Sequence, residues 1–380
     1  MKLLRLVLPG LTMIAVTYGL ARFSFGLLLP DIKESLGMSE AVSGIISSLF
    51  YFAYCVMIVL STVITTREGP RRMILLAGAS AFLGLLVMAV TPNVWVLAVG
   101  VFLAGASTGL ASPPYGAAIS LWMSRAEQGK GNTWINSGTS FGIALSGAGA
   151  ILLSPYWRVT YGIYAVLALL ALLWNFRVIP RAEKRWKVTF EKGNLSLKGI
   201  KGANSLITAS LILGISTAAF WTFSRSFIEI AGDYRSWELS GFWVVIGIFG
   251  VLGGFSGSLI EKYGLAFAYK LGSLSIASAS ILISIAPEKW LVSFASAGLF
   301  GGAYIFLTGV LLVWGIRVFI KNASLGIGIP FLLLAVGQVI GSSLAGLFIG
   351  AWGYAPAFIL YGFIGIAAVF IGPKKNKAED

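Results

Sequence analysis

The chain has 380 residues, of which 57% are hydrophobic and 11% charged, and its mean hydropathy is +0.88. A soluble globular protein carries about a quarter charged residues, so this composition excludes a soluble protein and indicates an integral membrane protein. The formal net charge is +14, with no histidine and one cysteine, Cys55, which excludes zinc clusters, Ser-His-Asp triads and a disulfide framework.

Apolar runs of about 18 residues or more predict membrane-spanning helices, since about 20 helical residues cross the hydrocarbon. Their length and their many glycines do not fit the ten-residue alternation of a transmembrane barrel. We therefore expect an all-α integral membrane protein with twelve transmembrane helices in two pseudo-symmetric six-helix bundles. The first run is too long for a signal peptide, so we expect it to be the first span. The predicted spans are 6–30, 43–65, 73–92, 94–122, 132–154, 159–179, 204–230, 238–260, 270–287, 290–316, 325–350 and 355–372.

Basic residues are distributed unevenly between alternate loops. With both termini placed inside, the outer loops hold only four of the 28 Lys and Arg residues, namely Lys33, Arg158, Arg235 and Lys289. Positive charge marks the cytoplasmic side of membrane proteins. We therefore expect a protein of the cytoplasmic membrane with both termini cytoplasmic, an N-terminal bundle at 1–180, a basic cytoplasmic linker at 181–202 and a C-terminal bundle at 203–380. Because the membrane topology accounts for the net positive charge, the charge does not indicate a nucleic-acid partner. We expect the lipid bilayer as a partner and no nucleic acid.

An internal repeat relates the two halves of the chain. Gly69 pairs with Gly264 and Trp95 with Trp290 at an offset of 195, Ser43–Gly44 pairs with Ser240–Gly241 at 197, and Gly147 pairs with Gly346 at 199. Such halves typically place a substrate site near the membrane midplane at their interface and expose it alternately to the two sides.

Arg22 and Arg225 are each the only ionisable residue deep inside an apolar segment, and the two segments occupy equivalent places in the repeat. An arginine facing hydrocarbon costs at least about 3 kcal/mol, so it usually faces a partner or a water-filled cavity. Its planar fork of donors suits a carboxylate or a phosphate. Tyr18 and Trp221 each lie four residues before an arginine, on the same face of the helix. These four residues predict a binding site for a small organic anion.

Other interpretations of the two arginines stay open. Glu229 follows Arg225 by four residues and could neutralise it, and both arginines lie nearer the outer ends of their spans, where snorkelling is less costly. Aromatic residues in a span more often serve packing, whereas a mid-span amide must find a partner. Further substrate-binding candidates are Gln338, Tyr51, Tyr54, Tyr115, Asn136, Thr139, Trp243 and Tyr304.

The acidic residues bear on the energy source. None lies mid-span, and only Asp31 and Glu229 lie near enough to a central cavity to take part in coupling. Proton relays in transporters are normally chains of intramembrane Asp, Glu or His. No Gly-x-x-x-x-Gly-Lys loop for ATP is present. We therefore hypothesise uniport or anion exchange, with protonation of the substrate or of Glu229 as the alternative route.

The loop after the second span of each half carries a motif of the form Gly-x-x-x-acid-base-x-Gly. The residues that fit it are Gly257, Glu261, Lys262 and Gly264 in the second half and Arg67, Gly69 and Arg71 in the first. In the first half Thr66 stands in place of the acid and Pro70 in place of a base, and Glu68 is a candidate substitute for the acid. In this motif the sequence resembles the major facilitator superfamily, and the resemblance covers the whole chain. The first span, with Tyr18, Gly19 and residues 21–26, is similar to a poorly characterised bacterial branch of that superfamily, a resemblance that does not indicate a substrate.

The resemblance implies a transporter rather than an enzyme. It also implies that the motif loops gate the cytoplasmic side and that anion-transporting members use paired basic residues in the first and seventh helices. We expect a monomer without a metal or cofactor, acting on a small-molecule substrate.

Three function classes follow. The leading one is a secondary transporter for a small organic anion, either a carboxylate or an organophosphate. The second is efflux of neutral or cationic amphipathic compounds, which the aromatic residues Phe220, Trp221, Phe223 and Phe227 would suit. The third is a non-transporting membrane receptor, which the short outer loops disfavour.

Overall fold

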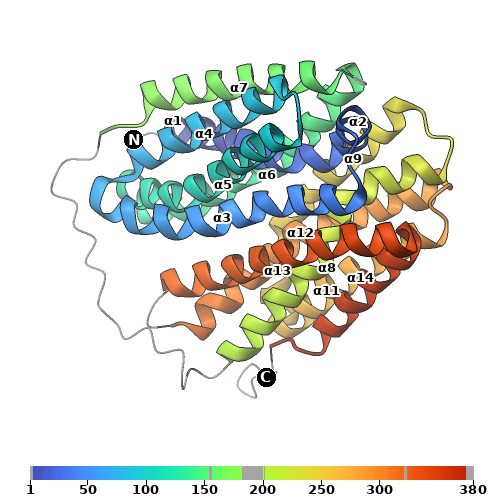
Figure 1. Ribbon diagram of the computed structural model, residues 1–380. Coiled ribbons are helices and arrows are strands. Elements are labelled where there is room, and N and C mark those ends of the chain that lie inside the picture. The colour runs from blue at the N-terminus through green and yellow to red at the C-terminus, as the bar shows by residue number, and fades with distance from the viewer. Residues whose placement is uncertain (1–2, 154–155, 182–199, 201, 321–322, 374–380) are drawn as a thin grey trace. The chain divides into compact units, whose positions relative to one another are not determined.

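The computed structural model describes residues 3–153, 156–181, 200, 202–320 and 323–373 (Figure 1). Within these residues the chain is helical, without strands, and the prediction of an all-α membrane protein is confirmed. Most of the predicted linker at 181–202 lies outside the described residues, as do the first two residues and the last seven.

The helices follow the predicted spans. In the first half they are α1 (Leu3–Ile14), η1 (Ala15–Phe23), α2 (Ser24–Leu36), α3 (Glu40–Glu68), α4 (Pro70–Val90), α5 (Val94–Trp122), α6 (Arg125–Leu153) and α7 (Trp157–Val178). In the second half they are α8 (Ala203–Ala231), α9 (Ser236–Gly250), η2 (Val251–Phe255), α10 (Ser256–Tyr263), α11 (Leu265–Ile285), α12 (Trp290–Val318), α13 (Ala323–Trp352) and α14 (Tyr354–Val369).

Two of the spans change their helical type partway along. The segment η1 is a π-helix that joins α1 to α2 without a break, and η2 is a 3₁₀ segment that joins α9 to α10. When α1, η1 and α2 are counted as one span, and α9, η2 and α10 as another, the described part of the chain contains twelve helical stretches. Ten of them are long and apolar enough to cross a membrane. The other two are α14, which has 16 residues, and α6, in which polar residues and glycines are interspersed among the apolar ones.

The chain divides into two compact units. Unit 1 comprises Met1–Met38, Leu49–Lys192 and Ser236–Gly247, and unit 2 comprises Ser39–Ser48, Gly193–Arg235 and Ile248–Asp380. The first turns of α3 therefore pack within unit 2, and most of α9 packs within unit 1.

In unit 1, α4 packs between α5 and α7, and the α1–η1 segment packs along α6. Glycines bring the backbones of η1 and α6 together, because a side chain at Gly142 would overlap the carbonyl of Ala15 and one at Gly19 would overlap Gly142. The apolar core of α1, α4, α5 and α6 includes Met13, Ile74 and Ile135. The close approach of η1 and α6 at Gly19 and Gly142 positions η1 within unit 1.

In unit 2, α8 packs against α13 and α14, and α11 packs between α12 and α14. The rings of Phe220 on α8 and Phe300 on α12 stack with centroids 3.8 Å apart and an interplanar angle of 10°. Close-packed aromatic rings thus line α8 beside the segment that carries Arg225.

Gly69 and Gly264, which the repeat pairs in sequence, adopt the same rare backbone conformation. Each precedes the first residue of a helix, with φ 79° and ψ 164° at Gly69 and φ 83° and ψ 159° at Gly264. Only glycine adopts this region without strain. The matching geometry shows that the duplicated loops turn alike.

We expect Gly69→Ala and Gly264→Ala each to lower the free energy of unfolding by about 1 to 3 kcal/mol, the cost of a strained backbone conformation. The measurement is the thermal unfolding temperature of the purified protein in detergent. Gly350→Ala is the matched control, because a Cβ at Gly350 meets nothing within 4 Å. Unchanged unfolding temperatures for both variants would contradict the assigned turn geometry.

Candidate functional site

The guanidinium of Arg22 lies among four aromatic rings in unit 1. Its Cζ atom is 4.7 Å from the ring centroid of Tyr51, 5.0 Å from Phe23, 5.2 Å from Tyr54 and 5.9 Å from Tyr18. Arg22 is only 6% exposed. Each such contact is worth about 0.5 to 2 kcal/mol, depending on desolvation, so the rings offset part of the cost of burying the charge.

The π-helical segment η1 carries both Tyr18 and Arg22. Tyr18 is anchored to α5, where its hydroxyl lies 2.6 Å from Ser112 Oγ. The predicted proximity of Tyr18 to Arg22 is present, although the local helix is wider than an α-helix. π-Helical turns are rare and occur frequently at functional sites, so η1 marks this part of the first span as a candidate site.

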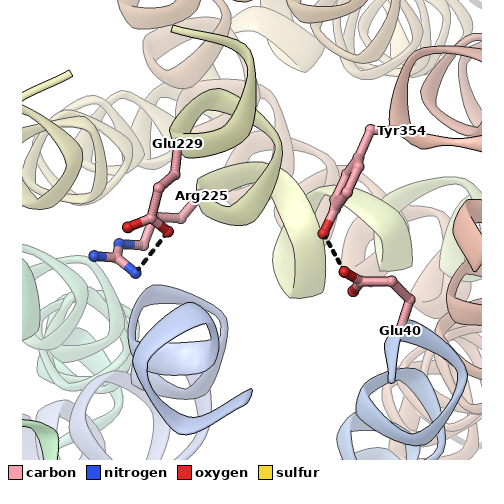
Figure 2. A network of polar contacts seen from close by, with 4 residues as sticks. All are labelled: Glu40, Arg225, Glu229 and Tyr354. Atoms are coloured by element: carbon pink, nitrogen blue, oxygen red, sulfur yellow. Dashed lines mark hydrogen bonds and ion pairs between the residues drawn. The ribbon is translucent and has the colours of Figure 1, made fainter. Parts of the chain in front are cut away.

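Arg225 is the corresponding arginine of unit 2, and its side chain is 3% exposed. Its Nη1 atom lies 3.3 Å from Oε2 of Glu229, one turn further along α8 (Figure 2). The helical ion pair considered from the sequence is therefore formed. Glu229 is about a third exposed, with a side-chain value of 34%, so one partner of the pair is buried and the other reaches the surface of the described chain.

Trp221 and Gln338 lie in one cluster with Tyr304 in unit 2. The Trp221 ring meets the rings of Phe300 and Tyr304 edge-on, with centroids 5.1 and 5.0 Å apart. Gln338 is buried, and its Nε2 atom donates to Tyr304 Oη at 3.2 Å and to Thr217 Oγ1 at 3.4 Å. The mid-span amide of Gln338 thus has the hydrogen-bond partners that it requires. One of them, Thr217, is not among the candidates predicted from the sequence.

Other candidates lie in different surroundings. Tyr115 belongs to the apolar core of unit 1, where its hydroxyl donates to Asn175 Oδ1 at 2.6 Å. Asn136 is exposed on α6 and donates to the backbone of Asn132. Trp243 is fully buried on α9, while Thr139 on α6 and Asp31 on α2 are half-buried. Roles for these five candidates in binding or coupling stay predictions.

Residues 11–329 match the sequence profile of the Major Facilitator Superfamily. The chain belongs to this superfamily. As a superfamily member it is a multi-pass membrane transporter, whose partners are a small-molecule substrate and the lipid bilayer.

Solved structures of transporters share the fold of this superfamily member. The nucleoside transporter NupG, in a mutant form, matches with a TM-score of 0.79 and 12% identity, covering 96% of this chain and 98% of its own. A D-xylose–proton symporter matches with a TM-score of 0.77 and 14% identity, covering 96% of each chain. A POT family transporter in complex with 5-aminolevulinic acid matches with a TM-score of 0.78 and 13% identity, covering 96% and 94%. At these identities the likeness shows the fold alone.

The superfamily motif loop of the first half makes local contacts within unit 1. Arg71 donates from Nη2 to the carbonyl of Phe176 at 2.6 Å, which joins the start of α4 to the end of α7. Glu68, the candidate substitute for the missing acid, pairs with Arg72 at the surface. Arg67 is exposed, as are Gly257, Glu261 and Lys262 of the second half, and Gly264 forms the turn before α11. Their gating role stays a prediction.

A polar contact between two helices is also not predicted from the sequence. The hydroxyl of Tyr354 donates to Oε1 of Glu40 at 2.8 Å, across 314 positions of the chain, and Figure 2 shows the two side chains pointing toward each other. The available signal was the position of Glu40, three residues before the repeated Ser43–Gly44 pair. Tyr354 has no comparable signal.

Proposed function

We propose that this transporter moves a small organic anion, a carboxylate or an organophosphate, by alternating access, and that Arg22 and Arg225 bind the anion. The observation that carries the proposal is one buried guanidinium in each unit, on the first and the seventh spans, with an aromatic residue one turn before it. The charge distribution supports a place in the cytoplasmic membrane with both termini inside.

The chemistry of the guanidinium favours an anion. Arginine stays charged at any relevant pH and presents five donors in a planar fork, which matches a carboxylate or phosphate with two parallel hydrogen bonds. The rings around Arg22 stabilise the cation, while an oxyanion would bind in the plane of the guanidinium. At Arg225, an arriving anion would compete with Glu229, whose 3.3 Å contact is long for a charge-assisted hydrogen bond.

A second candidate function is efflux of neutral or cationic amphipathic compounds. The stacked rings of Phe220 and Phe300 and the edge-on ring of Trp221 favour it, since aromatic surfaces bind apolar bodies and cations. In that case Arg22 and Arg225 would be structural, with Glu229 neutralising Arg225.

A ligand screen by thermal shift separates the two functions. The purified protein in detergent is heated with matched sets of organic anions, organic cations and the neutral amide of each carboxylate. A ligand at a hundred times its Kd stabilises the folded state by about 2.7 kcal/mol. We expect carboxylates or organophosphates to raise the unfolding temperature and their neutral amides to leave it unchanged. Stabilisation by the cations alone would favour amphipathic efflux.

A further inference from the structure

We propose that an apolar groove on unit 2 binds one acyl chain of an anionic phospholipid, and that Lys262 and Lys270 hold the headgroup of that lipid. The groove is lined by α12, by α11 and by the α9–η2 segment, and its volume is about 390 Å³, within the range of small-molecule sites. All of its lining residues belong to unit 2. The proposal depends on the place of the chain in a membrane and not on the substrate that it transports.

The groove lies where two segments pack closely on α12. A side chain at Gly298 of α12 would crowd the ring of Phe249 on α9, and one at Gly272 of α11 would overlap the side chain of Leu307 on α12. The α9–η2 segment and α11 therefore both approach the α12 backbone. Residues of all three elements line the groove that runs over α12 between the two segments.

Exposed apolar side chains form the walls of the groove. Phe249, Leu252 and Leu271 are all large, apolar and exposed. The three elements belong to helices long and apolar enough to cross a membrane. Exposed side chains of such spans contact hydrocarbon in the bilayer, so a groove with this lining is filled by acyl chains and not by water.

The length of the groove favours an acyl chain over a second protein helix. Along α12 the lining runs from Gly298 to Phe306, which is about 12 Å at 1.5 Å per residue. One leaflet of the hydrocarbon core is about 15 Å thick, whereas a second spanning helix crosses about 30 Å. Gly298 and Gly302 have the spacing at which membrane helices approach each other closely, but Phe249 already covers both of them within unit 2.

A row of residues leads from the groove to a positive charge. Phe267, Leu271 and Ser275 are four residues apart and share one face of α11. The ring of Phe267 lies 5.3 Å from the ring of Tyr263, the last residue of α10. The Nζ atom of Lys262 lies 5.0 Å from the centroid of the Tyr263 ring. This row therefore connects a cation suited to a phosphate with a groove suited to an acyl chain.

Lys270 supplies a second positive charge beside the groove lining, and it is exposed. The residues four before and four after it, Ala266 and Leu274, are apolar, so no ion pair at that helical spacing neutralises it. A lysine near the end of a span extends along apolar surface toward the headgroups, where it attracts anionic lipid. Because Glu261 is adjacent to Lys262, we expect Lys270 to contribute more of the attraction.

The experiment measures which lipid occupies the groove by quenching of a fluorophore in its wall. The full-length Cys55→Ala, Ser275→Cys protein carries a bimane label and is reconstituted in phosphatidylcholine nanodiscs. Phosphatidylglycerol or phosphatidylcholine, each with the same nitroxide-labelled acyl chain, is then added in steps. Each lysine near a membrane surface gives about a fivefold preference for an anionic lipid. We therefore expect phosphatidylglycerol to quench at a mole fraction about 5- to 25-fold lower than phosphatidylcholine.

Variants separate the headgroup contacts from the groove. Lys270→Gln and Lys262→Gln are each expected to lower the preference by up to about fivefold, and together to abolish it. Lys289→Gln is the matched control, because it removes an exposed lysine just before the first residue of α12, and it should keep the preference. Gly302→Leu fills the groove and should abolish the preference with both lysines present, since the nearest neighbour of a Cβ there is 3.4 Å away. A second reporter, Val166→Cys on the exposed surface of α7, should show no preference.

The preference at the Ser275 reporter decides the proposal. A preference for phosphatidylglycerol that is lost in the double lysine variant and in Gly302→Leu supports the site. Equal quenching by the two lipids in the parent overturns it, and so does a preference that survives either of these changes. Quenching by neither lipid at Ser275, with normal quenching at Val166, would show that a protein helix covers the groove and would also overturn the proposal.

Discussion

Replacing Arg22 or Arg225 with alanine is expected to weaken binding of the anion by about 30- to 4,000-fold, because losing a buried charge-assisted pair costs about 2 to 5 kcal/mol. Lysine at either position should recover only part of the affinity, since it keeps the charge but lacks the planar fork. Lysine at position 22 also lacks the guanidinium carbon, Cζ, that lies 4.7 Å from the centroid of the Tyr51 ring. The measurement is the Kd of the anion found in the ligand screen.

Arg72→Ala is the control for these variants. Arg72 is also an arginine with a carboxylate one turn away, Glu68, but its side chain is 71% exposed and lies at the surface. The Arg72→Ala variant should bind the anion with the same affinity as the parent protein. The unfolding temperature of each variant shows whether the fold is intact. Parental affinity for the anion in both folded alanine variants would show that the two arginines do not bind it.

Replacing Glu229 with glutamine is expected to tighten anion binding by about a few-fold to tenfold. The carboxylate lies 3.3 Å from Arg225 and competes with the anion for the guanidinium. The gain is limited because Glu229 is partly exposed, which screens the pair. If protonation of Glu229 couples transport to a proton gradient, the same variant should lose any uptake into proteoliposomes that depends on that gradient.

The matched control is Glu68→Gln, which breaks an ion pair of the same spacing at the surface, between Glu68 and Arg72. Its anion affinity and uptake should equal those of the parent. Accumulation driven by a pH gradient that persists in Glu229→Gln, with a fully ionised substrate, would overturn coupling through Glu229 and through protonation of the substrate.

The fold was largely predictable because hydrocarbon imposes a length and a composition on each span. The two helix distortions were not predictable. No periodicity marks η1 as a π-helix, since its nine residues keep an apolar pattern, and the close packing of Gly19 against Gly142 is visible only in the structure. The 3₁₀ segment η2 contains Gly253 and Gly254, but glycines occur throughout these spans, so they do not identify it.

The candidate site was predictable where it depends on spacing within one helix. The proximity of Tyr18 to Arg22 and the contact of Glu229 with Arg225 both follow from residues four positions apart. The approach of Tyr51 to Arg22 comes from a different helix, which a single sequence cannot place.

Glu40 lies just before the predicted span 43–65, where a carboxylate predicts no contact with another helix. Its contact with Tyr354 joins residues 314 positions apart, and the place of Glu40 near the repeated Ser43–Gly44 pair does not identify that partner. Long-range polar contacts of this kind depend on how the helices pack, whereas sequence spacing reports only which residues share a helix face.

Uptake into proteoliposomes tests the central claim most directly. The purified protein is reconstituted, and entry of a labelled anion from the ligand screen is compared with entry of a labelled amphipathic cation and with protein-free liposomes. We predict saturable uptake of the anion that is lost in Arg22→Ala and in Arg225→Ala. Uptake of the cation alone, at equal rates in the parent and in both variants, would contradict an anion transporter whose arginines bind the substrate.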